Sequence, residues 1–192
     1  MPLEEYDAIL LTGGRAARMG GADKPALDVG GRTLAARVAA AVADARRLVV
    51  VGPAYGVPAA VVTREDPPGA GPVAAIAAGL VHVTAPYVAV LAADLPFLDA
   101  ATVRALRADA VGQDVALLVD DTGRDQLLCA VWRTPGLGAS VGAVPTPAGA
   151  PVRALLGPVA RVARRTVSPA AGPPPWFDCD TPADLDRARR WT

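Results

Sequence analysis

The sequence predicts a three-layer α/β/α domain in which helices cover both faces of a mostly parallel sheet. Three observations support this class: the apolar runs are short, glycine and proline bound them, and stretches of helical composition separate them. Such an alternation is typical of βαβ units, whose parallel strands are buried on both sides. A chain of 192 residues has the size of one ordinary domain and shows no internal repeat. We therefore expect a single domain over residues 1–192.

The first half of the chain carries the clearest elements. Strands are predicted at Tyr6–Leu11, Arg47–Gly52 and Ala59–Thr63, and the segment Tyr87–Leu98 predicts an apolar strand that runs into Asp94. Helices are predicted at Thr33–Ala45, Gly71–Leu80 and Ala100–Ala110. Each helix has a marked beginning, which is a capping side chain at Thr33 and Asp99 and a proline at the first helical position, Pro72.

The second half is less regular. Strands predicted at Val115–Val119 and Leu127–Trp132 flank the polar segment DDTGRDQ, which indicates a hairpin or a tight connection. A last helix is predicted after Thr181, because a hydroxyl cap, a proline and an acid three residues after the cap stand together there. Between Pro135 and Pro175, where Gly, Pro and Ala crowd the chain, only Pro151–Gly157 predicts a helix. By position alone, this stretch could bind an acceptor, with Arg124, Asp125 and Gln126 nearby.

Composition argues against several kinds of partner. Basic and acidic residues balance at 19 each, so no overall field favours nucleic acid or an anionic membrane. No apolar run reaches the roughly 18 residues that suggest a membrane span. The start, MPLEEYDAILL, has acids where a signal peptide has bases, which predicts a cytoplasmic protein. We expect neither nucleic acid nor a membrane as a partner, and any attraction for phosphate must be local.

Cysteine and histidine are too few for several chemistries. Cys129 and Cys179 are isolated and lack the spacing of a zinc or redox site. Two buried thiols are the simpler interpretation, and a single disulfide is the alternative. His82 is the only histidine and stands in an apolar helical stretch, so we expect a packing or surface role. A bound metal should then be a hard cation held by carboxylates.

The segment LLTGGRAARMGGADKPAL (Leu10–Leu27) places four glycines, two arginines and Lys24 directly after the first strand. Ligands bind at the carboxyl ends of strands in an open α/β sheet, and glycines let backbone N–H groups surround an anion. Lys24 is the only lysine, since the other 18 basic residues are arginines, and a compact ammonium suits phosphate oxygens. The segment predicts a loop that binds nucleotide phosphates. A solvated connecting loop is the alternative, because neither the G-x-G-x-x-G nor the P-loop pattern is present.

Four aspartates lie after predicted strands or before the last helix, at positions where they could contact a bound nucleotide. Asp94 ends an apolar strand and precedes a proline, so it should reach the same rim as the glycine-rich segment and could hold Mg²⁺ against a triphosphate. Its alternative role is to cap a turn. Asp66 also follows a strand and could instead be a polar loop residue. Asp178 and Asp180 precede the last helix, and one of them could be a turn residue.

Four segments, in order, resemble the molybdenum cofactor guanylyltransferases and related MobA-like nucleotidyltransferases. The first is LLTGGRAARMGGADKPAL, which resembles the signature loop of that family. VTREDPPGAGPVAAIAAGL resembles its acidic and glycine–proline segment, LAADLPFL its metal-binding aspartate segment, and FDCDTPADL its asparagine–threonine–proline segment. The resemblance spans Leu10 to Leu185 and implies a Rossmann-like nucleotidyltransferase fold, in agreement with the pattern of strands and helices.

The resemblance implies a role for each matching position. Backbone contacts to the nucleotide fall to Leu11, Thr12, Gly13 and Gly14. Arg18 and Lys24 would bind the phosphates and, with Asp94, form the catalytic set, while Asp66 would lie in the nucleotide pocket. Asp94 would ligate Mg²⁺ together with Asp180; both Asp178 and Asp180 stand where the family commonly has asparagines.

The implied activity is transfer of GMP from GTP to the terminal phosphate of molybdopterin, with release of pyrophosphate. Transient contacts with proteins of molybdenum cofactor biosynthesis, or with acceptor proteins, are implied as well. Two departures leave the base open: Gly52 stands where relatives carry an asparagine that touches the nucleotide, and Thr12 replaces a commoner alanine. CTP or another phosphorylated acceptor therefore remains an alternative.

Two further classes remain as alternatives. A non-catalytic protein that binds a nucleotide or molybdopterin would keep the glycine-rich segment but would not need Asp94 and Asp180 to converge on a metal. A dehydrogenase-like protein is disfavoured, because the first turn lacks the dinucleotide-binding spacing.

Overall fold

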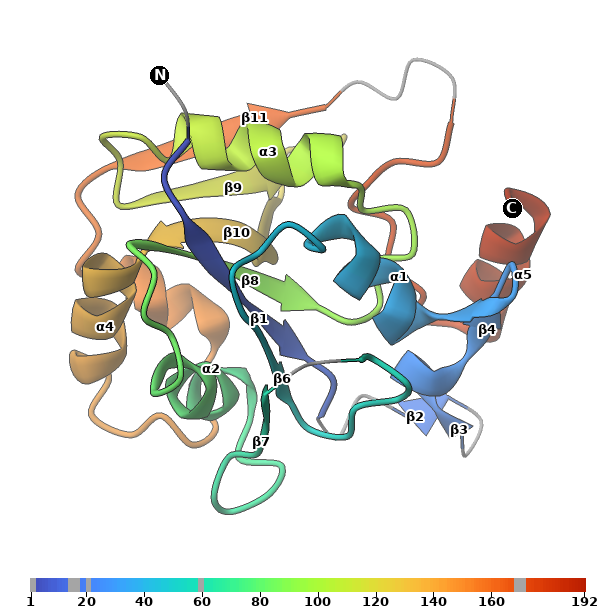
Figure 1. Ribbon diagram of the computed structural model, residues 1–192, viewed down its shortest axis with the longest axis horizontal. Coiled ribbons are helices and arrows are strands. Elements are labelled where there is room, and N and C mark those ends of the chain that lie inside the picture. Colours follow the sequence, from blue (N-terminus) through green and yellow to red (C-terminus); the bar gives the residue numbers. More distant parts are fainter. Residues whose placement is uncertain (1–2, 14–17, 20–21, 59–60, 168–171) are drawn as a thin grey trace.

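A seven-stranded sheet, in the order β11-β9-β10-β8-β1-β6-β7, forms the centre of the molecule (Figure 1). The computed structural model describes residues 3–13, 18–19, 22–58, 61–167 and 172–192. The strands of the sheet are β1 (Tyr6–Leu11), β6 (Leu48–Val51), β7 (Val61–Thr63), β8 (Tyr87–Ala92), β9 (Val115–Val119), β10 (Asp125–Arg133) and β11 (Val162–Thr166). Parallel pairing joins β8, β1, β6 and β7, and also β9 and β11, whereas β10 is antiparallel to both of its neighbours.

Helices cover both faces of this sheet (Figure 1). One face packs against α1 (Leu34–Ala41) and α3 (Ala100–Asp109), and the other against α2 (Pro72–Leu80) and α4 (Thr134–Gly142). Successive side chains of a strand point to opposite faces, so Leu10 of β1 joins the first core and Ile9 the second. All six residues of β1 are buried as a result. The predicted three-layer, mostly parallel fold is confirmed.

Boundaries in the first half differ from the prediction mainly at the ends of elements. The helix capped by Thr33 ends at Ala41 rather than Ala45, because the chain turns there and brings the N–H of Arg46 to the carbonyl of Tyr6. β8 ends at Ala92, two residues before Asp94, and the N–H of Ala93 makes its last bond to β1, at the carbonyl of Leu11. Asp94 therefore lies in the turn after the strand. The part of β7 predicted at residues 59–60 lies outside the described residues.

The second half contains two elements that the sequence did not predict. α4 has three glycines in nine residues, a composition that disfavours a helix, and β11 (VARRT) is a polar edge strand that pairs with β9. The predicted hairpin between β9 and β10 is confirmed, and the predicted helix at Pro151–Gly157 is the 3₁₀ helix η3 (Val152–Leu156). The last helix, α5 (Pro182–Arg190), begins with the predicted capping box of Thr181 and Asp184.

Short elements connect the first strand to α1. They are β2 (Arg18–Met19), β3 (Ala22–Asp23), the 3₁₀ helix η2 (Lys24–Ala26), β4 (Asp28–Val29) and β5 (Arg32–Thr33). Cys129 and Cys179 are both free and buried, as predicted, and burial raises the pKa of each thiol to about 12. Within the described residues, the helices are too short or too polar for a membrane span.

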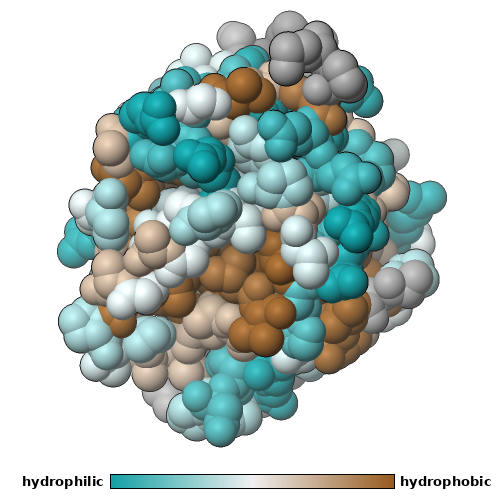
Figure 2. Space-filling view, turned by 60° about the vertical axis from the view of Figure 1, so that its left-hand side comes forward, coloured by the Kyte–Doolittle hydropathy of each residue, from teal (hydrophilic) through white to brown (hydrophobic). Residues whose placement is uncertain are grey.

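Hydrophobic residues also reach the surface on the side of the molecule that carries α4. Figure 2 shows them gathered near the middle of that face, with hydrophilic residues around them. Side chains of the second core are only partly buried along α2, α4 and η3, among them Leu80, Val141 and Leu156. Small residues in these helices leave the core thinly covered on this side.

Candidate active site

A cleft of about 590 Å³ opens at the carboxyl ends of β1 and β8, and we call it the first cleft. Its walls are mostly glycine, alanine and proline from the end of β1, the segment before α2 and the end of β8. The polar side chains on these walls are Thr12, Lys24, Glu65, Asp94 and Asp180. Volume and lining are typical of a small-molecule site, in which a few polar groups orient the ligand.

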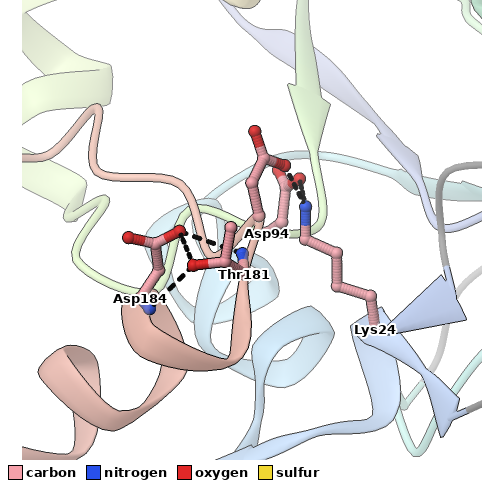
Figure 3. Close-up of polar contacts among 5 residues, drawn as sticks. Lys24, Asp94, Thr181 and Asp184 are labelled. Carbon is pink, nitrogen blue, oxygen red and sulfur yellow. Dashed lines mark hydrogen bonds and ion pairs between the residues drawn. The ribbon is translucent and has the colours of Figure 1, made fainter. Parts of the chain in front are cut away.

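Lys24 lies between two carboxylates at one end of this cleft. Its Nζ donates to Asp94 Oδ2 at 2.7 Å and to Asp180 Oδ1 at 2.5 Å. Figure 3 shows the Lys24 side chain extended toward Asp94, with Thr181 and Asp184 beside them at the start of α5. The side chain of Lys24 is 7% exposed, against 25% for Asp94 and 64% for Asp180. The lone lysine and the predicted metal-binding aspartate thus share one cleft.

Backbone contacts bring these three residues together. Lys24 is the first residue of η2, which packs against α1. The N–H of Cys179 donates to the carbonyl of Asp94 at 3.1 Å and so ties the segment before α5 to the end of β8. The capping box of Thr181 and Asp184 then fixes where α5 begins, directly after Asp180.

The electrostatics of the cluster favour the ionised forms of Lys24 and Asp180. Burial pulls the pKa of Lys24 down, but attraction to Asp94 and hydrogen bonds to both carboxylates outweigh this and raise it. The hydrogen bond from Lys24 lowers the pKa of Asp180. Asp178 behaves in the opposite way: burial, and then repulsion from Asp180 and Asp94, raise its pKa to about 6. The two aspartates that precede α5 therefore differ in charge in mildly acidic solution.

A second cleft, of about 750 Å³, lies on the other side of Asp94. It shares Ala92, Asp94 and Leu128 with the first cleft, and Asp178 lines it, whereas Asp180 lines the first. Other polar side chains on its walls come from the β9–β10 hairpin, η3 and β11: Arg124, Asp125, Gln126, Arg153 and Arg164. Arg124, Asp125 and Gln126 thus lie beside η3, which belongs to the stretch that could bind an acceptor.

The arginines of the second cleft are not equivalent. Arg164 makes a bidentate pair with Asp125, at 2.8 and 3.0 Å. Arg124 and Arg153 are exposed, and neither forms a salt bridge within the described part of the protein. Arg124 acts on the cluster only at longer range, where its charge helps to lower the pKa of Asp180. Two cations with free donors thus face the cleft beside Asp94.

The residues predicted to contact the nucleotide through their backbone fall partly where expected. Leu11, Thr12 and Gly13 line the first cleft. The N–H groups of Thr12 and Gly13 both donate to the carbonyl of Val51, at 3.0 and 3.2 Å, so they are already engaged in joining β1 to β6. The predictions for Gly14 and for the side chain of Arg18 lie outside what the structure describes.

Asp66 is the predicted site residue that the structure does not bring into the cleft. It is exposed, whereas the adjacent Glu65 is buried and lines the first cleft. Gly69 N–H donates to Glu65 Oε1 and so holds the Glu65 side chain toward the cleft. The sequence RED offered no means of choosing between the two acids. His82, in the turn after α2, lines neither cleft.

The carboxylates of the cluster suit a hard divalent cation. Among the described residues no group of three metal-binding side chains is close enough to hold an ion by itself. Mg²⁺, however, is usually held by one or two carboxylates together with water and substrate phosphates, which matches Asp94 and Asp180 on the wall of one cleft. Because Asp180 lines the same cleft as Lys24 and Asp178 does not, Asp180 is the better candidate of the two.

Comparison with known proteins places the chain in a family. The chain belongs to the family of MobA-like NTP transferase domains, whose model matches residues 8–162. It is 38% identical over 129 residues to the molybdenum cofactor guanylyltransferase of Bradyrhizobium sp., covering 60% of this chain and 59% of that one. It is 36% identical over 112 residues to a probable molybdenum cofactor guanylyltransferase of Natronomonas pharaonis, covering 50% and 52%. The chain thus spans between half and three fifths of the length of these relatives.

Solved structures share the fold at lower sequence identity. Molybdopterin-guanine dinucleotide biosynthesis protein A from Archaeoglobus fulgidus superposes with a TM-score of 0.74 at 20% identity, covering 96% of this chain and 97% of that one. The 2-C-methyl-D-erythritol 4-phosphate cytidylyltransferase from Thermus thermophilus gives 0.70 at 21% identity, covering 95% and 97%. These likenesses confirm the nucleotidyltransferase type of α/β fold that the sequence predicted.

Proposed function

We propose that this protein is a nucleotidyltransferase that moves GMP from GTP to the terminal phosphate of molybdopterin and releases pyrophosphate. The observation that carries the proposal is the Lys24 ammonium held by Asp94 and Asp180 inside the first cleft. Membership of the MobA-like family and the names of the relatives support the reaction class and the acceptor. We also propose that the reaction takes place in the cytoplasm.

Lys24 is the group best placed to bind the phosphates. An ammonium has three N–H donors, and the two carboxylates take two of them, which leaves one for a phosphate oxygen. Its raised pKa keeps it charged at neutral pH. In a cleft sheltered from water, a positioned cation of this kind stabilises the charge that develops on the leaving pyrophosphate.

Asp94 and Asp180 would hold the magnesium ion, as their place on the same wall as Lys24 allows. When bound, the ion neutralises charge on the triphosphate. The turn after β8 and the start of α5 fix these two carboxylates relative to Lys24, so their role is to position the ion. Arg18, whose backbone lies in β2, is proposed as a second phosphate ligand.

The second cleft would receive the acceptor. Arg124 and Arg153 offer two guanidinium groups, which suit a phosphate monoester, and Asp94 stands between this cleft and the first. An acceptor phosphate held there attacks the α-phosphorus of GTP. The bond from that phosphorus to the bridging oxygen then breaks, and pyrophosphate leaves with the bonding electrons. An acceptor phosphate is already anionic near neutral pH, so the reaction needs no general base.

Replacement of the lone lysine tests the proposal. With GTP, Mg²⁺ and molybdopterin, the native protein should release pyrophosphate, and Lys24→Ala should lower turnover about a hundredfold or more, the usual effect of losing a preorganised donor. Arg104→Ala is the matched control, since Arg104 is an exposed cation on α3 that lines neither cleft. Turnover of Lys24→Ala within threefold of the native protein would contradict the assigned role.

The pyrophosphate assay, together with thermal unfolding in the presence of GTP, separates the alternative functions. A non-catalytic binding protein would be stabilised by GTP against heat but would release no pyrophosphate. A related transferase would release pyrophosphate with CTP, or with a different phosphorylated acceptor, in preference to GTP and molybdopterin. Release only when GTP, Mg²⁺ and molybdopterin are all present is the result that we expect.

A further inference from the structure

Glu65 carries a buried oxygen that nothing in the described structure satisfies. The residue is 5% exposed and lines the first cleft. Its Oε1 accepts a hydrogen bond from the N–H of Gly69 at 2.8 Å, whereas its buried Oε2 has no partner among the described residues. A buried acceptor without a donor costs free energy, so a carboxylate in a ligand cleft with one oxygen unused indicates a donor on the ligand.

Glu65 and Lys24 reach the first cleft from different elements of the fold. Asp94 follows β8, whereas Glu65 follows β7, and β1 and β6 lie between these two strands. The carboxylate of Glu65 reaches toward the end of β1, since its Oε1 would lie 4.0 Å from a Cβ placed on Gly13. A nucleotide that lies along the first cleft with its phosphates at Lys24 would pass this carboxylate, which we take as the place of the base.

Among the described residues, the other side chains near Glu65 are poorly placed to read a base. Thr12 Oγ1 donates to the carbonyl of Val51 at 3.2 Å and is buried. Gly52 has no side chain, and a Cβ there would come within 2.6 Å of the N of Gly13 and 2.7 Å of Thr12 Oγ1. Thr12 and the backbone of Gly13 thus leave no room for a side chain at position 52. Among the described residues that line this part of the cleft, Glu65 is the polar side chain that remains.

We propose that Glu65 reads the base of the nucleotide and selects guanine, an inference that rests on the proposed nucleotide site. An ionised carboxylate can only accept hydrogen bonds. Guanine presents two adjacent donors, N1–H and the N2 amino group. Adenine and cytosine each present a donor beside an acceptor, and uracil presents one donor between two acceptors. Guanine is therefore the base that satisfies Glu65 without placing a lone pair against the carboxylate.

Nucleotide affinity measured by titration calorimetry with Mg²⁺ tests this inference without any acceptor. The native protein should bind GTP most tightly, ITP about tenfold more weakly because inosine lacks the N2 amino group, and ATP and CTP about a hundredfold more weakly. Equal affinity for GTP and ITP, or a preference for ATP or CTP, would overturn the assignment. Because this series uses the native protein, it is decisive even if a Glu65 variant fails to fold.

Glu65→Gln gives a second, gain-of-function readout. The amide can still accept from Gly69 N–H and presents an NH₂ group where Oε2 stood. This variant should bind GTP about a hundredfold more weakly and should prefer XTP, since xanthine has a carbonyl in place of the N2 amino group. Glu5→Gln, the same change at an exposed residue before β1, is the control and should leave all affinities unchanged. GTP binding by Glu65→Gln within threefold of the native value would refute the role of Glu65.

Failure of this inference and failure of the proposed function are distinguishable. If the protein binds nucleotides without regard to the base and still releases pyrophosphate, the transferase proposal holds and base selection by Glu65 is wrong. If no nucleoside triphosphate binds, the proposed function itself is wrong.

Discussion

The two clefts on either side of Asp94 are lined by different kinds of residue. The first is lined mostly by glycine, alanine and proline, with few polar side chains. The second has arginines and acids from three separate elements, the β9–β10 hairpin, η3 and β11. One cleft is thus shaped by close-packed backbone, and the other is defined by charge.

This difference indicates how each cleft discriminates between ligands. In the first, small residues set the shape, and Glu65 and Lys24 are among its few polar side chains. In the second, Arg124 and Arg153 attract an anion but set little shape. A change of backbone geometry should therefore damage the first cleft and spare the second, whereas loss of one of the exposed arginines should damage the second and spare the first.

The largest effect is expected at the residue that both clefts share. Asp94→Asn removes the charge that holds Lys24 and would hold Mg²⁺, so we expect turnover to fall about a thousandfold. Single-turnover pyrophosphate release measures this, with Asp186→Asn on the exposed side of α5 as the control. Activity retained at low magnesium would show that the metal lies elsewhere.

Gly52→Ala should break the first cleft through the backbone. Gly52 has φ +117°, and an added Cβ would approach the N of Gly13 to 2.6 Å, so strain and overlap should lower the free energy of unfolding by about 2 kcal/mol. Urea unfolding measures this, and GTP affinity should fall with it while the acceptor's KM changes little. Gly138→Ala in α4, where a Cβ meets nothing within 4 Å, is the matched control. Equal stability of the two variants would count against a first cleft built on close backbone contacts.

The second cleft should respond to charge alone. Arg124→Ala and Arg153→Ala should each raise the KM for the phosphorylated acceptor about tenfold, the usual value of one charge-assisted hydrogen bond, and leave GTP affinity within about twofold. Steady-state kinetics with the acceptor varied at saturating GTP measure the effect. A loss of GTP affinity as large as the rise in KM would mean that the two clefts are one binding site.

Sequence reasoning reached the first cleft because its signals are local. A strand, a glycine-rich segment and the only lysine are contiguous, and parallel strand ends place Asp94 at the same rim. Sequence reasoning placed Asp66 rather than Glu65 in the nucleotide pocket. The direction of a side chain in an irregular segment depends on tertiary contacts, such as the hydrogen bond from the N–H of Gly69 to Glu65, which the sequence does not reveal. Sequence reasoning reached the second cleft only through the position of Arg124, Asp125 and Gln126 in the chain. The arginines of this cleft come from segments that only the sheet order brings together, among them β11, a polar strand without a strand-like sequence.

The smallest predicted effect compares the two aspartates that face different clefts. Asp178 has a raised pKa of about 6 in the folded protein. Between the ordinary aspartate pKa and this value, the folded protein holds a proton that the unfolded chain has already released. Its contribution to stability is therefore lost as the pH rises through 6. Asp178→Asn should stabilise the protein at pH 7.5, by no more than about 1 kcal/mol because the residue is partly exposed, and should have little effect near pH 4.

Asp180→Asn should have the opposite sign. The hydrogen bond from Lys24 lowers the pKa of Asp180, so its contribution is present above the ordinary aspartate pKa and is lost as the pH falls. Urea unfolding of both variants at pH 7.5 and pH 4.5 should show Asp178→Asn more stable and Asp180→Asn less stable than the native protein at the higher pH, with both differences smaller at the lower. The same sign for both variants at pH 7.5 would mean that Lys24 does not distinguish the aspartate of the first cleft from that of the second.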